Sequence, residues 1–141
     1  HEVRLKKLAS DLGMADRVHF YGSVAGEKLI DYYNAFDVLV VPSKATPQWE
    51  EQYGRVLVEA MACHLAIVGS SSGAISQVLE GYPKHVICRE DNPKDLAEKI
   101  IKAQELAFPE NFDAKSFMQR YSLENFVKKS IQFYAKLSSV R

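Results

Sequence analysis

The sequence predicts an α/β domain in which helices flank a parallel sheet, and three observations support this class. Short apolar runs alternate with segments of helical periodicity about ten residues long, a pattern typical of strands joined by crossover helices. Several runs are continuously apolar, as strands covered on both faces are. The chain has 141 residues, 47% of them hydrophobic. It is therefore long enough to bury the core of one such domain.

The elements follow in chain order from periodicity and local signals. The predicted helices, where apolar residues recur three and four positions apart, are residues 5–12, 29–33, 54–63, 74–80, 93–107 and 123–134. The predicted strands, which are short apolar runs, are residues 18–21, 37–42, 65–69 and 85–88. Residues 22–25 predict a turn. Gly13 stands where a left-handed helix end is expected, and Asn92 with Pro93 is a strong helix start.

The middle of the chain predicts a βαβ unit. Residues 54–63 are almost entirely apolar apart from Arg55 and Glu59. They lie between the apolar runs at 37–42 and 65–69. A buried helix between two buried strands is the repeating unit of a parallel sheet.

A long loop, residues 43–53, precedes this helix. Long loops in compact domains are often functional. Ligands of parallel α/β sheets bind at the carboxyl ends of the strands. The loops of interest therefore follow Tyr21, Pro42 and Gly69.

Charge and composition exclude several classes of function. Eighteen basic and eighteen acidic residues leave no net charge, so we expect no nucleic-acid partner. No apolar run approaches the roughly 18 residues of a membrane span, and no signal peptide opens the chain. Cys63 and Cys88 are too few for a disulfide framework or a zinc site, which predicts a cytoplasmic location. Because the chain opens on His1 and reads as helix almost at once, we expect it to be part of a longer protein.

The last segment has a local charge excess. Residues 116–141 contain five basic residues and one acidic residue. Such an excess could contact anionic lipid and give peripheral membrane association, but a solvated helix face is the favoured interpretation.

Two glutamates lie on either side of the predicted helix start at Gly54. Glu51 precedes it in the loop, and Glu59 follows five residues later, about 7.5 Å along the axis. The helix terminus offers free amides from Tyr53 to Val56 and a partial positive charge, which suit a diphosphate. Glu59 is placed to accept both hydroxyls of a ribose, and Glu51 those of a sugar beyond the phosphates. Sugar, diphosphate and ribose in this order describe a nucleotide sugar.

Ordinary structural roles for the same residues remain open. Arg55 and Glu59 are four residues apart, so they could form an exposed helix pair worth a few tenths of a kcal/mol. Glu51, next to Glu50, could be a solvated loop charge. Lys44 and Arg55 could offset diphosphate charge or remain in solvent. For Glu59 the balance shifts, because a lone glutamate on so apolar a helix is costly unless it is paired or meets a polar ligand.

This stretch resembles the E-x7-E segment of the retaining glycosyltransferases of family 4. The likeness rests on Glu51, Gly54 and Glu59, followed by Ala-Met-Ala at residues 60–62. Similar stretches occur, in the order of the family, at residues 18–24, 40–43, 66–68, 72–75 and 91–97. The resemblance covers nearly the whole chain. It implies the Rossmann-like, donor-binding C-terminal half of a GT-B enzyme.

The resemblance also implies roles for single residues. Glu51 would hold hydroxyls of the transferred sugar and is the catalytic candidate, whereas Glu59 would hold the ribose diol. The implied donor-binding positions are Glu59, Tyr53, Gly54, Arg55, Val56, Gly22 and Val24. Among these, the amides from Gly54 to Val56 would receive the diphosphate, and the backbone near Val24 would touch the base. The resemblance implies a UDP-sugar or GDP-sugar donor and neither a metal nor another cofactor.

The chain departs from the family in three places. His64, Ala66 and Ser76-Gln77 stand where the family usually has Gly, Pro and Pro-Glu. A left-handed helix end at His64 brings modest backbone strain, which Gly would avoid.

Parts of similar enzymes are missing from the sequence. In those enzymes two more strands, with an Arg and a Lys for the diphosphate, precede the first helix seen here. In the order of strands across the sheet, these two strands would lie between the predicted strands at residues 18–21 and 37–42. The N-terminal acceptor domain is also missing.

These observations lead to one leading hypothesis and several alternatives. In the full-length protein we expect transfer of a sugar, with retention, from a nucleotide sugar to a glycan or lipid-linked acceptor, as in cell-surface polysaccharide biosynthesis. With a lipid-linked acceptor, the enzyme would work at the inner face of the membrane. The alternatives are a donor-binding module or fragment without activity by itself and a sugar-nucleotide epimerase of the same fold. A dinucleotide oxidoreductase is disfavoured, because no G-x-G-x-x-G opens a βα turn.

Overall fold

The structure, a computed structural model, describes residues 2–24 and 26–138 and divides the chain into two compact units. The first unit extends to residue 31 and the second begins at residue 32. The elements of the first unit are α1 (Glu2–Asp11), the 3-10 turn η1 (Ala15–Arg17) and the beginning of α2 (Glu27–Ala35). Residue 25, at the end of the predicted turn, lies outside the described residues.

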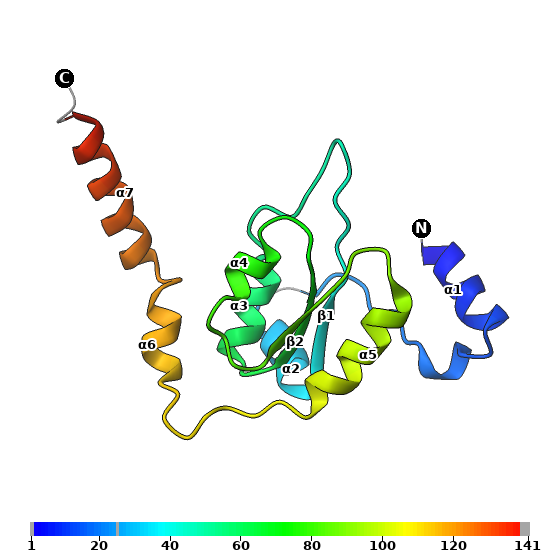
Figure 1. Cartoon of the computed structure of the whole chain (residues 1–141). Helices are drawn as coiled ribbons and strands as arrows, with labels where there is room; N and C mark the ends of the chain where they lie inside the picture. The colour runs from blue at the N-terminus through cyan, green and yellow to red at the C-terminus, as the bar shows by residue number, and fades with distance from the viewer. Residues whose placement is uncertain (1, 25, 139–141) are drawn as a thin grey trace. The chain divides into compact units, whose positions relative to one another are not determined.

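The second unit contains the sheet (Figure 1). Its elements after α2 are β1 (Val38–Val41), α3 (Arg55–Ala62), β2 (Ala66–Ser70), α4 (Ile75–Leu79), β3 (His85–Cys88), α5 (Pro93–Gln104), α6 (Ala114–Gln119) and α7 (Leu123–Ser138). The three strands are parallel and lie in the order β1-β2-β3. Val38 pairs with Ala66, and Ile67 with His85. The predicted α/β class with a parallel sheet and flanking helices is confirmed.

Helices cover both faces of the central strand β2, which is buried along its whole length. On one face, Ala66 and Val68 share a core cluster with Ala103 of α5. On the other face, Gly69 lies against α4. A Cβ atom at Gly69 would come 2.4 Å from Cγ2 of Ile75, so only glycine fits there unless α4 shifts. This layering leaves the carboxyl ends of the strands open to loops.

Several element boundaries match their sequence signals. The Asn92 side chain accepts a hydrogen bond from the backbone N–H of Asp95 at 2.9 Å, which caps α5. Asp95 in turn accepts the N–H of Arg89 at 2.7 Å, a bond that lowers the pKa of the Asp95 carboxyl. Gly13 has φ of 65° and His64 has φ of 61°, so both predicted left-handed positions are confirmed.

Other sequence predictions are wrong. Residues 18–21 form no strand, because a strand requires a hydrogen-bonded neighbour and the described sheet contains only β1, β2 and β3. β1 is half-buried rather than covered on both faces, since it lies at an edge of the described sheet. Helix α6 was not predicted. It is short, and its signal is Asp113, whose side chain accepts the N–H of Ser116 at 3.0 Å.

We predict that Ile67→Ala lowers the free energy of unfolding by about 2–5 kcal/mol, because Ile67 is fully buried in β2 and truncation leaves a cavity. Urea denaturation measures the change. The control is Ile101→Ala on α5, where the same side chain is 63% exposed and we expect a change within about 0.5 kcal/mol. Equal losses in the two variants would contradict the placement of the core.

Candidate functional site

The candidate site lies at the carboxyl edge of the sheet, where the loop of residues 43–53 meets the turn after β2. The carbonyl oxygen of Glu51 accepts the backbone N–H of Ala74 at 2.8 Å. Gly73, the residue before Ala74, has φ of 51°, and a Cβ atom there would lie 2.1 Å from the carbonyl oxygen of Glu51. Only glycine permits this approach without moving the loop. The position of Glu51 is therefore set by the turn that follows the central strand.

Glu51 also caps the start of α3. Its Oε1 accepts the backbone N–H of Gly54 at 2.9 Å, and Gly54 itself has φ of 63°. In the described chain, the N–H groups of Arg55 and Val56 have no protein acceptor. The first amide of the predicted anion site is thus held by Glu51, and the next two remain open to a ligand.

Glu59 lies on the exposed side of α3, away from the buried Leu57. Its Oε2 accepts a hydrogen bond from the hydroxyl of Tyr33 in α2 at 2.8 Å. Burial, and then the bond to Glu59 and its charge, raise the pKa of Tyr33, so this hydroxyl stays a donor at neutral pH. A carboxylate has about four acceptor positions, and Glu59 keeps capacity for a ligand.

The sequence argument about Glu59 needs correction. We expected apolar surroundings, whereas α3 is amphipathic and the glutamate has both solvent and a partner. The alternative of an ion pair with Arg55 is not seen in the structure either. Sequence reasoning missed Tyr33, because a partner 26 residues away leaves no local signal.

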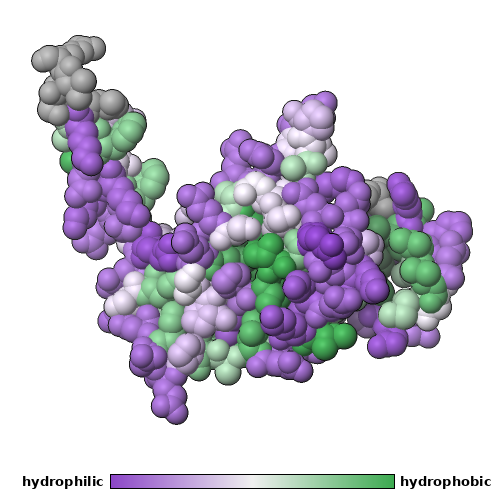
Figure 2. All heavy atoms as spheres, viewed as in Figure 1, coloured by the Kyte–Doolittle hydropathy of each residue, from purple (hydrophilic) through white to green (hydrophobic). Residues whose placement is uncertain are grey.

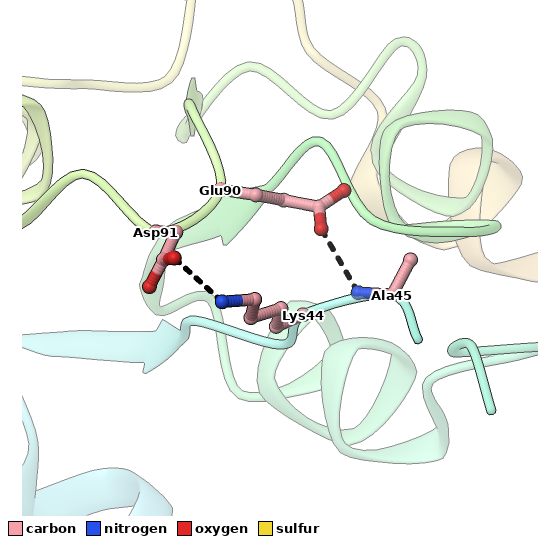
Figure 3. Close-up of polar contacts among 4 residues, drawn as sticks. All are labelled: Lys44, Ala45, Glu90 and Asp91. Carbon is pink, nitrogen blue, oxygen red and sulfur yellow. Dashed lines mark hydrogen bonds and ion pairs between the residues drawn. The ribbon is translucent and has the colours of Figure 1, made fainter. Parts of the chain in front are cut away.

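The upstream end of the loop is tied to the segment after β3 (Figure 3). Nζ of Lys44 lies 2.5 Å from Oδ2 of Asp91, and the N–H of Ala45 donates to Oε2 of Glu90 at 2.9 Å. Lys44 therefore has an anionic partner within the chain. Because this pair is exposed, it is worth at most about 1 kcal/mol.

The structure brings one group of the predicted residues together within the second unit. Glu51, Tyr53, Gly54, Arg55, Val56 and Glu59 all lie on the loop end and α3, with Tyr53 and Arg55 exposed. Gly22 and Val24 belong to the first unit, in a segment without helix or strand. Ser72, in the turn after β2, has a fully buried hydroxyl without a hydrogen-bond partner among the described residues.

A metal site and a membrane span are both absent from the part of the chain that the structure describes. No three His, Cys, Asp or Glu side chains gather as a metal site would require. None of the described helices combines the length and the apolar character needed to cross a bilayer.

Comparison with known proteins places the chain in a family. Residues 1–120 match the family of glycosyl transferases group 1, and the chain belongs to this family. It is 31% identical over 97 residues to D-inositol 3-phosphate glycosyltransferase of Streptomyces bingchenggensis, a match that covers 69% of this chain and 20% of that protein. The chain spans about a fifth to a third of the length of the curated relatives that it matches.

Solved structures show the same fold. Sucrose-phosphate synthase from Thermosynechococcus elongatus matches with a TM-score of 0.72 at 26% identity, over 98% of this chain and 34% of the synthase. HepE of Anabaena, solved in complex with UDP, matches with a TM-score of 0.69 at 24% identity, over 96% of this chain and 36% of HepE. The fold is therefore the Rossmann-like one of GT-B glycosyltransferases.

We predict that Gly73→Ala destabilises the protein by about 1–3 kcal/mol, because the new Cβ atom collides with the Glu51 carbonyl and the backbone has positive φ. Thermal or urea unfolding measures the effect. In the matched control, Gly22→Ala, the methyl group meets no atom within 4 Å, and we expect a change below about 1 kcal/mol. A Gly73→Ala variant as stable as the control would show that the loop moves freely.

Proposed function

We propose that this chain is the donor-binding domain of a family 4 retaining glycosyltransferase and that Glu51 to Glu59 form its E-x7-E segment. The full-length enzyme would transfer a sugar from a nucleotide sugar to a glycan or lipid-linked acceptor, as in cell-surface polysaccharide biosynthesis. One observation carries the proposal. At the start of α3, two carboxylates flank two amides that have no protein acceptor. Membership of the glycosyl transferases group 1 supports the reaction class.

The diphosphate would bind the amides of Arg55 and Val56 at the positive end of α3. The amide of Gly54 now bonds to Glu51. If a phosphate oxygen takes this amide, the Glu51 carboxylate is released and can accept hydroxyls of the transferred sugar. Negative charge that develops on the leaving diphosphate would then meet fixed backbone dipoles, so the step needs no metal ion or other cofactor in this proposal.

The nucleoside would bind further along α3. Tyr33 holds one oxygen of Glu59, which orients the carboxylate to accept both hydroxyls of the ribose. The backbone of Gly22 and Val24 would contact the base. HepE, which shares this fold, was solved with UDP. We propose a UDP-sugar or GDP-sugar as the donor here.

Acceptor binding would need residues outside this chain. The chain covers a fifth to a third of its curated relatives, and an N-terminal acceptor domain would complete the cleft. By itself the chain would bind donor without transferring sugar. We propose a cytoplasmic location for the enzyme, at the inner face of the membrane when the acceptor is lipid-linked. The basic residues after 116 would then favour anionic lipid.

We predict that Glu59→Ala in the full-length protein weakens binding of the nucleoside diphosphate about tenfold or more, through loss of charge-assisted bonds to the ribose. Glu51→Ala should mainly lower the turnover number. Calorimetry and a transfer assay measure the two effects. The control is Glu98→Ala, an exposed glutamate on α5. The assignment fails if donor affinity and turnover stay unchanged in both variants, and interconversion of the nucleotide sugar without acceptor would indicate an epimerase.

We further predict that Tyr33→Phe raises the dissociation constant of the nucleoside diphosphate about threefold to tenfold, because the Glu59 carboxylate loses its orienting bond. The double variant with Glu59→Ala should bind no more weakly than Glu59→Ala alone. Additive losses in this double-mutant cycle would show that Tyr33 acts by another route.

A further inference from the structure

The loop of residues 43–53 has a hydrogen-bonded tip that projects from the carboxyl edge of the sheet (Figure 1). The N–H of Thr46 donates to the carbonyl of Trp49 at 2.7 Å, and the N–H of Trp49 donates back at 3.2 Å. The same N–H of Trp49 lies 3.0 Å from Oγ1 of Thr46. These bonds close a turn over Pro47 and Gln48. The indole of Trp49 is thus carried on a fixed backbone, and it is 53% exposed.

A polar cavity lies at this tip. Its volume is about 620 Å³, and residues 46–52 line it, with Glu51 among them. One run of seven consecutive residues lines all of it and most of them are exposed, so it is an open hollow on the surface. The lining combines one large aromatic ring with two carboxamides and two carboxylates, from Gln48, Gln52, Glu50 and Glu51. Figure 2 shows that the projecting tip is polar to intermediate in hydropathy rather than an apolar patch.

We propose that Trp49 is a stacking platform for a pyranose ring, a role that rests on the proposed function because it deepens the sugar site at Glu51. A pyranose has C–H groups on its faces and hydroxyls around its rim. An indole face covers the C–H groups, carboxamides donate to and accept from the hydroxyls, and carboxylates accept from them. The lining of this cavity matches both requirements.

The negative charge of the lining favours a sugar over anionic ligands. Glu50 and Glu51 place two carboxylates at the cavity, so a phosphate or an anionic lipid headgroup would be repelled there. An uncharged, hydroxyl-rich ring meets no such penalty.

The loop is also anchored at both ends before a ligand binds. Its upstream end is tied through Lys44 and Ala45 to the segment after β3, and its downstream end through Glu51 to Ala74. A ligand therefore meets a site whose backbone is already ordered, which reduces the entropy lost on binding. The ring can come from the donor or from a glycan acceptor, because both present the same chemistry next to Glu51.

The test compares Trp49→Ala and Trp49→Phe with the control Phe126→Ala, whose ring is also exposed. The probes are UDP, a panel of UDP- and GDP-sugars, and methyl glycosides of the same sugars, with the full-length enzyme. We expect Trp49→Ala to raise the dissociation constant or KM of a sugar-bearing probe about tenfold, while Trp49→Phe stays within about threefold of wild type and UDP binding is unchanged. An effect on nucleotide sugars alone assigns the ring to the donor, and an effect on glycosides assigns it to the acceptor.

Two results would overturn the inference. One is wild-type affinity of Trp49→Ala for every sugar probe. The other is an equal loss for UDP and UDP-sugars, which would make Trp49 a contact for the base or the phosphates. These outcomes are distinct from failure of the proposed function. If Glu59→Ala leaves nucleotide binding intact, the donor assignment fails. If Glu59→Ala weakens nucleotide binding as predicted but Trp49→Ala changes the affinity for no sugar probe, only the stacking role is rejected.

Discussion

The double contact of Glu51 organises the whole candidate site. Its carbonyl is fixed by the turn after the central strand, and its carboxylate is fixed by the first amide of α3. Both contacts require a glycine with positive φ, Gly73 in one case and Gly54 in the other. A loop that would otherwise be free is thereby joined to the most buried strand of the domain. The position of the buried strand therefore sets the geometry of the site.

The same arrangement explains how an anion site can exist without a cluster of cations. Lys44 pairs with Asp91, so it does not offer a free charge. What remains is the exposed Arg55 together with the backbone, which offers two amides and the positive end of α3. In the absence of donor, the Glu51 carboxylate provides the negative charge that this helix end attracts. If the donor binds as proposed, exchange of the Glu51 carboxylate for a phosphate oxygen would link donor binding to the position of Glu51.

Features encoded locally were predictable from the sequence. The cap at Asn92 and the left-handed positions of Gly13 and His64 depend on neighbouring residues, and the structure confirms them. Features that depend on distant partners were not. Residues 18–21 are apolar enough for a strand, but pairing decides whether a strand forms. Likewise, nothing near Glu59 in the sequence points to Tyr33, and the site contacts of Gly22 and Val24 remain predictions.

The anchoring of the loop of residues 43–53 at both ends also has an evolutionary consequence. Between Ala45 and Glu51, the chain leaves the sheet edge and returns to it, and neither anchor depends on what lies between. Loop-closure entropy changes slowly with length, by roughly 0.6 kcal/mol for each doubling. Insertions, deletions and replacements at the tip are therefore tolerated without moving Glu51. If Trp49 and Glu51 to Glu59 have the proposed roles, sugar preference could therefore change at the tip while the nucleotide-binding residues stay the same.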